Sequence, residues 1–414
     1  MTNSTSQSQS ERKEITPEEA QQLLATGKAL QNVSVRRLTL EGDFEEAVSF
    51  QNVELENCKI LKANFKKGLT LQGCQLKRLH IGESVIEGNL DMRRSTLNLV
   101  DLLKTQVSGQ LQLDRIKAVA SFRLNQVKLR GGVKTWDARF SDWVEFHKTE
   151  FGGTADFRSF HADEGFVATD CRFKGDFLFR GSTVTKKLEF SRSRFDGLTD
   201  FSKSKLHDVV YLETIEQGPK QVFAFRNALF NRVLIKPEQL AGRIQAEEAG
   251  KHEDAAEEYG SLKNNFQHLN RYDAEDWAFY RFKVNKRRAL PAWRPLGKLC
   301  SFLFLDLGCG YGARPFRAIF SAAVMILLFA GIYVGGYDNF QDPQPPIPEL
   351  GEDHIANRGL FALMTSVSVF TAGFTGEHLR GAQGWLLGPL ALEALMGTLL
   401  WGLFIVAFSR KVIR

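Results

Sequence analysis

The residues with the clearest capacity for chemistry lie near the C-terminus, in the stretch from Asn357 to Glu377, which reads NRGLFALMTSVSVFTAGFTGE. Hydroxyl and apolar side chains alternate along it, and it ends with Gly373, Gly376 and Glu377. Non-helical backbone at membrane depth persists only where protein buries it or where it lines a water-filled path. The stretch therefore predicts a short helix that leads into a glycine-containing strand beside such a path.

Two apolar runs flank this stretch. The first extends from Phe316 to Tyr337 and contains one charge, Arg317. The second extends from Trp385 to Phe408 and contains one ionisable group, Glu393. About 20 apolar residues in a helix cover a hydrocarbon core roughly 30 Å thick. Both runs are therefore predicted to span a membrane.

The order of helix, loop and helix resembles the two-helix potassium channels of bacteria. Within it, ALMTSVSVFTAGFTGE (Ala362–Glu377) resembles their pore helix and filter, where Thr-Val-Gly-Tyr-Gly-Asp is usual. The resemblance covers about the last 100 residues and implies a re-entrant pore loop. It implies that the selectivity filter is formed by Thr371, Ala372, Gly373, Phe374, Thr375, Gly376 and Glu377. A monovalent cation, K⁺ or Na⁺, is then the permeating species, and no cofactor is implied.

The filter string departs from the usual one. When the two are aligned without gaps, their glycines fall out of register. When they are aligned on Gly373 and Phe374, Thr375 becomes an inserted residue. Potassium selectivity depends on stacked carbonyl rings that replace the hydration shell of the ion, and an inserted residue disturbs that stacking. The string from Thr371 to Phe374 also resembles the single-glycine loops of Trk-type potassium transport proteins. Both families surround the pore with four loops, so the resemblance implies a homotetramer and leaves the ion preference open.

The second apolar run carries two candidate pore or gating residues, Glu393 and Gly397. An ionisable group inside a membrane span is costly unless it is paired or faces water. Glu393 is expected either to hydrogen-bond the back of the pore loop, at Ser366 or Ser368, or to line the cavity. Gly397 lies four residues later on the same helix face, near the usual hinge glycine of the channel family, and allows bending or close packing there.

Basic residues before and at the first span are candidates for contact with anionic lipid: Lys286, Arg287, Arg288, Arg314 and Arg317. Further basic residues follow the second run, whereas acidic residues populate the segment between the runs. Positive charge favours the cytoplasmic side of a membrane, so we expect both termini in the cytoplasm and the spans in the plasma (inner) membrane. A nucleic-acid-binding patch is the rival interpretation, which the adjacent span disfavours.

The bulk composition agrees with a membrane-associated protein. The formal net charge is +6 over 414 residues, which is modest for a nucleic-acid binder. The cysteine count is five, with no CxxC pair, which favours a reducing cytoplasm over disulfides or a zinc site. Residues 1–14 lack the apolar core of a signal peptide and are predicted to be a disordered tail.

A periodic region follows a short predicted helix over residues 15–32, for which Thr16 is the expected N-cap and Pro17 the first helical residue. From residue 33 to 236, large apolar residues return every five or six positions, as at Phe190, Phe195 and Phe201. Such self-similarity indicates a solenoid. The units, such as TADFRSF and KGDFLF, resemble pentapeptide-repeat proteins, which implies a right-handed quadrilateral β-helix. At about 20 to 22 residues per turn, the region holds nine or ten turns.

The surface of this predicted rod is less informative. Some pentapeptide-repeat proteins mimic DNA with an acidic surface, but Lys and Arg slightly outnumber Asp and Glu in this chain, which disfavours that role. His80, His147, His161 and His207 lie far apart in sequence, without the spacing of metal ligands. A cytoplasmic ligand or protein partner on the rod remains an open expectation.

Residues 237–290 are predicted to be a helical connector. Tyr259, Leu262, Phe266 and Leu269 form an apolar stripe at helical spacing, expected to pack on the end of the rod or on a neighbouring subunit. Residues 291–315 are predicted to form a juxtamembrane elbow, in which Asp306 and Tyr311 could couple rod to pore, and residues 316–414 the channel domain.

The elbow contains LFLDLGCGYG (Leu303–Gly312), which resembles the glycine-rich first motif of S-adenosylmethionine-dependent methyltransferases. That motif requires a strand, a helix and a second strand ending in an acidic residue, whereas Pro315 and a membrane-length run follow here. The prediction is therefore a non-enzymatic, tetrameric cation channel with a cytoplasmic rod. A non-conducting, membrane-anchored scaffold is the alternative, and a methyltransferase is the remote one.

Overall fold

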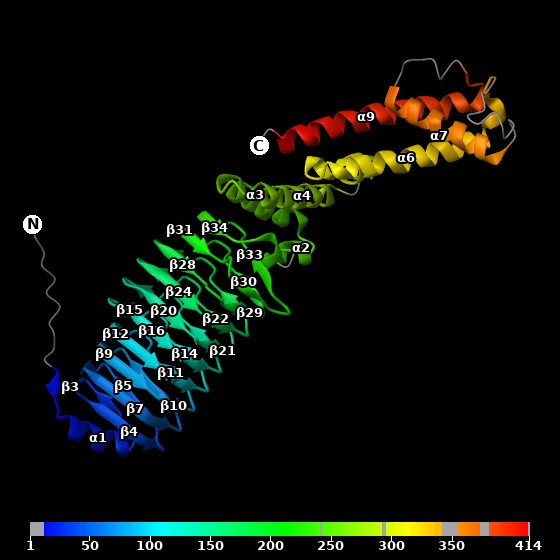
Figure 1. Cartoon of the computed structure of the whole chain (residues 1–414). Coiled ribbons are helices and arrows are strands. Elements are labelled where there is room, and N and C mark those ends of the chain that lie inside the picture. Colours follow the sequence, from blue (N-terminus) through cyan, green and yellow to red (C-terminus); the bar gives the residue numbers. More distant parts are fainter. Residues whose placement is uncertain (1–11, 241, 292–294, 342–353, 373–380, 413–414) are drawn as a thin grey trace, which may run out of the picture. The chain divides into compact units, whose positions relative to one another are not determined.

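The computed structural model describes residues 12–240, 242–291, 295–341, 354–372 and 381–412. The chain forms two compact units, Met1–Asn270 and Arg271–Arg414 (Figure 1). The first contains the strands and the second the apolar helices. The boundary between the units falls inside the predicted connector, so the helices of residues 237–290 are divided between them.

The first unit is a β-solenoid of about 10 turns, in which the strand pairs are parallel. The smaller of its two sheets consists of β2 (Leu30–Gln31), β5 (Val48–Gln51), β8 (Leu69–Gln72), β11 (Leu90–Asp91), β14 (Leu111–Gln112), β18 (Val133–Lys134), β22 (Ala155–Asp156), β26 (Phe177–Leu178), β30 (Leu198–Asp200) and β33 (Val222–Ala224).

The larger sheet consists of β1 (Lys13–Glu14), β3 (Val33–Arg36), β4 (Thr39–Phe44), β6 (Glu54–Glu56), β7 (Cys58–Phe65), β9 (Gln75–Gly82), β10 (Val85–Ile86), β12 (Thr96–Leu103), β13 (Gln106–Val107), β15 (Lys117–Ala118), β16 (Phe122–Asn125), β17 (Lys128–Leu129), β19 (Arg139–Phe140), β20 (Val144–His147), β21 (Glu150–Phe151), β23 (His161–Ala162), β24 (Gly165–Thr169), β25 (Arg172–Phe173), β27 (Thr183–Val184), β28 (Lys187–Glu189), β29 (Arg194–Phe195), β31 (Lys205–Tyr211), β32 (Glu216–Gln217) and β34 (Leu229–Leu234).

The strand register fixes the length of a turn. Leu30 pairs with Phe50, Leu90 with Leu111, and Val133 with Ala155, so these turns take 20 to 22 residues, as the sequence predicts. The last turn is longer, with 24 residues between Leu198 and its partner Val222. One corner of the solenoid carries a left-handed residue in every turn: Asn32, Asn52, Gly73, Arg94, Arg115, Asp137, Ser159, Gly181, Lys203 and Asn227. Because the backbone bends sharply there, each turn closes over the one before it, about 4.8 Å away.

The core of the solenoid is the predicted ladder of large apolar side chains. Phe151, Phe173 and Phe195 stack face to face in consecutive turns, with ring centroids 4.7 and 4.9 Å apart. All three are buried. Aromatic pairs at such separations add about 1 kcal/mol per pair beyond the burial of the rings. Each turn therefore buries its apolar side chains only by contact with its neighbours.

The N-terminal end of the solenoid is covered by α1 (Pro17–Ala25). Thr16 is its N-cap, with the hydroxyl accepting a hydrogen bond from the amide of Glu19 at 3.2 Å, so the predicted cap is confirmed. The helix is shorter than the predicted 15–32, because the chain turns at Gly27, in the left-handed region, and enters β2. Leu24 is buried against the first turn.

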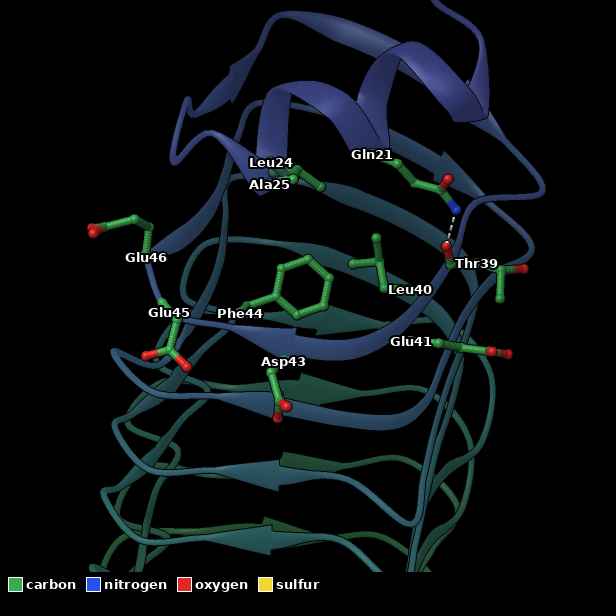
Figure 2. A pocket seen from close by; sticks show the side chains of 10 residues that line it. All are labelled: Gln21, Leu24, Ala25, Thr39, Leu40, Glu41, Asp43, Phe44, Glu45 and Glu46. Carbon is green, nitrogen blue, oxygen red and sulfur yellow. Dashed lines mark hydrogen bonds between the residues drawn. The ribbon is translucent and has the colours of Figure 1, made fainter.

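A pocket of about 500 Å³ lies beside α1, at the outer edge of β4 (Figure 2). Gln21 donates a hydrogen bond to the carbonyl of Thr39 there. Four carboxylates follow the strand and its end, Glu41, Asp43, Glu45 and Glu46. Charges on an edge strand oppose pairing with another chain. Among the described residues, no group of three or more His, Cys, Asp or Glu side chains is placed to hold a metal ion.

The C-terminal end of the solenoid is covered by a 3₁₀ turn (Pro237–Leu240), α2 (Gln245–Glu248) and α3 (His252–His268). Tyr259, Leu262 and Phe266 of the predicted stripe are buried, and α3 contacts β34, so the stripe packs on the rod, the first of the two predicted options.

Two polar side chains of α3 replace a further turn of the solenoid. The amide of Asn265 accepts from the N–H of Val233 at 2.8 Å and donates to its carbonyl at 2.9 Å. Glu258 accepts from the N–H of Phe225 at 2.7 Å. The last turn therefore meets side-chain atoms where another strand would otherwise supply backbone atoms.

The second unit is helical. Its described elements are α4 (Tyr272–Ala289), α5 (Pro295–Cys300), the π-helix η2 (Ser301–Leu307), the 3₁₀ turns η3 (Gly310–Gly312), η4 (Tyr337–Asn339) and η6 (Gly384–Leu386), α6 (Phe316–Gly335), α7 (Ile355–Ala372) and α9 (Leu387–Val412). Two described stretches, Phe316–Gly335 and Gly384–Ser409, are long and apolar enough to cross a membrane. They coincide with the two predicted spans.

Candidate functional site

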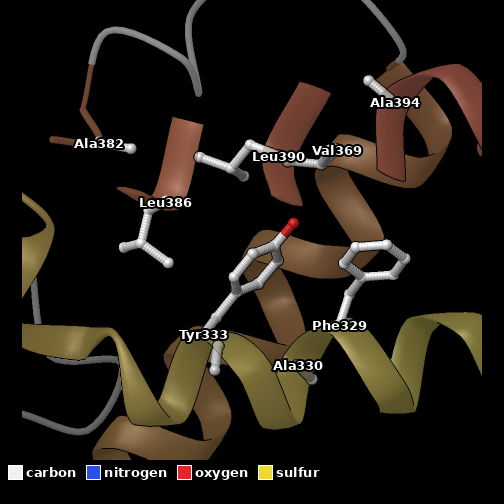
Figure 3. Close-up of a cluster of buried hydrophobic side chains, with 9 residues drawn as sticks. Phe329, Ala330, Tyr333, Val369, Ala382, Leu386, Leu390 and Ala394 are labelled. Atoms are coloured by element: carbon white, nitrogen blue, oxygen red, sulfur yellow. The ribbon is translucent and has the colours of Figure 1, made fainter. Parts of the chain in front are cut away.

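The site is built where α7 lies against both membrane-capable helices. Side chains from α6, α7 and α9 share an apolar cluster that includes Phe329, Tyr333, Val369 and Leu390 (Figure 3). The predicted short helix is confirmed as a helix but is longer than expected, because it begins at Ile355. At 1.5 Å per residue, its 18 residues extend about 27 Å.

A buried carboxylate joins the three helices. Glu393 of α9 is 0% exposed. It accepts a hydrogen bond from the hydroxyl of Tyr333 on α6 at 2.5 Å, and the hydroxyl of Ser366 on α7 donates to its other oxygen. The predicted bond to Ser366 is therefore present. Tyr333, whose hydroxyl points away from α6 in Figure 3, is a partner that the sequence did not indicate.

Gly397 lies at a close approach between α7 and α9. A Cβ atom at this position would lie 2.6 Å from the carbonyl oxygen of Phe370, which is far inside van der Waals contact. The helix α9 runs without a break through Gly397. The sequence predicted that this glycine allows either bending or close packing, and the structure shows the close packing.

Both ends of the segment that contains α7 lie at the C-terminal end of α6. Arg358, in the first turn of α7, forms an ion pair with Asp338 at 3.3 Å. After α7, Ala382 forms an antiparallel bridge with Phe340, and the amide of Gln341 donates to the carbonyl of Gly381 at 2.7 Å. Between these contacts, the Ser366 hydroxyl reaches the carbonyl of Ile326 in the middle of α6 at 2.9 Å.

The predicted filter begins at the C-terminal end of α7. Thr371 lies in the last turn, where its hydroxyl donates to the carbonyl of Val367 at 2.7 Å, and Ala372 is the last residue of the helix. The remaining predicted filter residues, Gly373, Phe374, Thr375, Gly376 and Glu377, lie outside the described residues.

An apolar groove of about 380 Å³ lies next to this end of α7. Phe370 and Thr371 line it together with residues of α6 and α9, namely Ala318, Ile319, Ala322, Ala323, Ile326, Leu400, Trp401 and Phe404. Apart from the Thr371 hydroxyl, which is already bonded within α7, and the indole N–H of Trp401, its lining side chains are apolar. The groove therefore suits hydrocarbon rather than a polar ligand.

The elbow is held by a second buried carboxylate, Asp306 of the π-helix, which is 6% exposed. Tyr280 of α4 donates a hydrogen bond to it at 2.9 Å, and Arg287 of α4 forms an ion pair with it at 2.8 Å. At the start of α6, Arg317 donates to the backbone carbonyl of Asp306 at 3.3 Å. Asp306 therefore links α4 to the first membrane-capable helix.

The five basic residues predicted at the membrane surface fall into two groups. Arg287, with its side chain 12% exposed, and Arg317 contact Asp306, and Arg314 lies over the ring of Tyr280 at 4.6 Å. Lys286 and Arg288 are exposed on α4. Lys286 lies over the ring of Phe282 at 5.7 Å. Charge pattern alone did not reveal that Arg287, Arg314 and Arg317 contact Asp306 or Tyr280.

The glycine-rich stretch Leu303–Gly312 forms the end of the π-helix and the 3₁₀ turn after it. Gly310, Tyr311 and Gly312 have left-handed backbone conformations, and Cys309 is buried in a small cluster with Ala318 and Ala407. A helix rather than a strand precedes the glycines. In this chain, they reverse the backbone between η2 and α6.

No family model, curated protein or solved structure matches this chain. The function proposed for it therefore rests on its residues and on their arrangement, together with the family resemblances drawn from its motifs.

Proposed function

We propose that the chain is one subunit of a homotetrameric cation channel of the plasma membrane, with K⁺ or Na⁺ as the permeating ion. In this proposal, α6 and α9 span the bilayer and α7 is the pore helix of a re-entrant loop. The solenoid, a pentapeptide-repeat β-helix, and both termini lie in the cytoplasm, where the solenoid provides a sensory or scaffolding surface.

The observation that carries the proposal is the path of the chain around α7. Contacts at Arg358 and Ala382 hold both ends of the segment at one end of α6, while Ser366 reaches the middle of that helix. A segment that enters and leaves on one side, between two membrane-capable helices, supports a loop that returns to the same face of the bilayer.

The helix direction supports cation conduction. The C-terminus of a helix carries about half a negative charge from its unpaired carbonyls. The C-terminal turn of α7 contains Thr371 and Ala372, the first two residues of the proposed filter. A cation at the start of the filter would therefore be stabilised by α7.

Glu393 and Gly397 support this role by fixing where the end of α7 lies. Glu393 ties α7 to α6 and α9 through two hydroxyl groups, and Gly397 admits the backbone of α7 at Phe370. In the proposed channel, Glu393 is a positioning residue and does not contact the ion. Gly397 is proposed to set the contact between the inner helix and the pore helix during gating.

The test is ion flux in liposomes that contain the purified full chain, with K⁺ and Na⁺ gradients compared. Gly373→Asp should abolish flux, because it places a side chain in the proposed filter. Gly397→Ala should reduce flux at least tenfold, because the added methyl group meets the Phe370 carbonyl. Gly402→Ala is the matched control, since nothing lies within 4 Å of a Cβ atom at that position of α9.

Potassium-dominated flux lost in Gly373→Asp supports a selective filter despite Thr375, whereas equal flux of both ions supports a non-selective pore. Flux unchanged in Gly397→Ala contradicts the positioning of α7 by Gly397. Absence of flux from verified tetramers, under varied pH, calcium and tension, favours the non-conducting membrane-anchored scaffold over the channel.

A further inference from the structure

A groove of about 480 Å³ crosses the first four turns of the solenoid, and its lining residues lie between Arg37 and Asp101. It is lined by Arg37, Thr39, Asn57, Cys58, Lys59, Arg78, Leu79, His80, Leu99 and Asp101. Cavities of this volume accept small molecules.

The register of the strands orders these side chains in two rows. Thr39, Lys59, His80 and Asp101 occupy one row, as successive pairing partners in β4, β7, β9 and β12. Arg78 pairs with Leu99 in the second row, two positions earlier along the strands. Partners in adjacent turns are about 4.8 Å apart, so the groove gathers its cationic groups within the reach of one small ligand.

The cations of this groove differ from other cations on the same turns. Arg36 is paired with Glu14 at 3.3 Å, Lys66 with Glu87 at 2.9 Å and Lys77 with Glu54 at 2.9 Å.

By contrast, no carboxylate of the described chain lies within ion-pair distance of Arg37, Lys59 or Arg78. The one carboxylate that lines the groove, Asp101, is bonded to His80 Nδ1 at 3.0 Å. The groove therefore holds three cations that form no ion pair and a single carboxylate, so positive charge is in excess.

Like charges on neighbouring strands repel each other, and a bound anion removes that repulsion. We propose that the groove binds a small phosphorylated compound that carries at least two negative charges. Guanidinium groups match phosphate oxygens in pairs, and the lysine adds a point charge. The amide of Asn57 and the hydroxyl of Thr39 are further donors, and Leu99, 37% exposed, offers an apolar surface at the far end.

The same chemistry fits a soluble phosphate compound and the headgroup of a phospholipid. This inference does not depend on ion conduction, because it concerns the solenoid alone. The test is therefore a binding measurement on the purified full chain in detergent, by calorimetric titration with inorganic pyrophosphate. Flotation with phosphatidylcholine vesicles, with and without phosphatidic acid, forms the second arm.

The variant is Arg37→Gln, Lys59→Gln, Arg78→Gln, and its matched control is Arg36→Gln, Lys66→Gln, Lys77→Gln. Both remove three exposed cations from the same turns, and circular dichroism checks that each folds. Pyrophosphate affinity should fall at least tenfold in the first variant and less than threefold in the control.

Loss confined to the first variant in the pyrophosphate arm supports a soluble ligand. Phosphatidic-acid-dependent flotation lost in that variant, without pyrophosphate binding, supports a headgroup ligand. An equal loss of binding in both variants would mean that binding depends only on the net charge of the solenoid, and it would overturn the proposal. Absence of binding in both arms also overturns it.

Discussion

Glu258 and Glu393 are both buried carboxylates, one in each unit, and they differ in what they bond. Glu258, 3% exposed, accepts from a backbone N–H at the end of the solenoid. Glu393 accepts from two side-chain hydroxyls between helices. The backbone of a helix satisfies itself, whereas the last turn of a solenoid leaves groups that require partners.

The difference shows that a buried polar side chain, which is costly to desolvate, serves two structural purposes in this chain. In the solenoid, a buried polar side chain ends a repeating structure by completing backbone hydrogen bonds. In the helical unit, it joins elements whose backbones are already complete, so it determines which helices lie together. Four substitutions test this distinction, from the largest expected effect to the smallest.

Asn265→Ala should destabilise the solenoid by about 4 kcal/mol, because it leaves both the N–H and the carbonyl of Val233 buried without the amide that bonds them. The measurement is urea unfolding of the full chain, followed by circular dichroism. Asn264→Ala, at the exposed position next to it, is the control and should change stability by less than about 0.5 kcal/mol. Equal effects of the two would show that Asn265 is not a cap.

Glu258 should make the stability of the solenoid depend on pH. Burial raises the pKa of Glu258 from 4.5 to about 7, against the opposing effect of the Phe225 N–H. Asp200 and Asp254 add to the rise, and Arg226, which pairs with Asp254 at 3.0 Å, opposes it.

Because the folded chain holds this proton more tightly than the unfolded chain, the contribution is complete below pH 4.5 and is lost as the pH rises to about 7. The loss is on the order of 3 kcal/mol. Unfolding midpoints of Glu258→Gln should lack this component. A variant with the same pH profile as the natural chain would assign the dependence to another group.

Glu393→Leu should destabilise the helical unit by about 2 kcal/mol, because the buried hydroxyl of Tyr333 loses its acceptor. Adding Tyr333→Phe should restore most of this loss, since no hydroxyl is then left at position 333 and the Ser366 hydroxyl keeps its bond to the carbonyl of Ile326. A double-mutant cycle in detergent, read by thermal unfolding, measures the coupling. Additive effects would indicate that the two groups do not interact.

Thr16→Ala should cost about 1 kcal/mol, the usual value for removing an N-cap. The loss should appear as earlier proteolysis at the N-terminal end of the solenoid. Thr26, whose hydroxyl bonds the carbonyl of Leu23 at the other end of α1, provides the comparison. An undisturbed protease pattern in Thr16→Ala would mean that α1 does not protect this end.

The sequence predicted the features that repeat or that depend on apolar spacing. The spacing of Phe190, Phe195 and Phe201 gave five or six residues per repeat unit, because large residues fill the interior of a narrow solenoid. The turn length followed only with the four faces that the pentapeptide-repeat resemblance implied. The stripe at Tyr259 and Leu262 could be predicted because apolar residues at helical spacing mark the buried face of a helix. The two membrane-length runs could also be predicted, because a helix that spans a bilayer must be a long and almost uninterrupted apolar segment.

The polar contacts were not readable in this way. Spacing gives no sign that Asn265 bonds Val233, because the two lie 32 residues apart and meet only through the fold. Tyr333 sits 60 residues from Glu393 and looks like another apolar residue of its run. Arg287 and Arg317 were expected at the lipid surface, but both form ion pairs with Asp306. The sequence does not show these pairs, because they depend on how the chain folds.

The self-similar turns of the solenoid have an evolutionary consequence. Because successive turns pair through parallel strands and share a left-handed corner, a gain or loss of one whole turn can preserve the backbone pairing between neighbouring turns. The length of the solenoid then changes in steps of about 4.8 Å, from a present extent of roughly 50 Å. The length of such a solenoid can therefore evolve by whole turns, while the elements that cap its two ends stay unchanged.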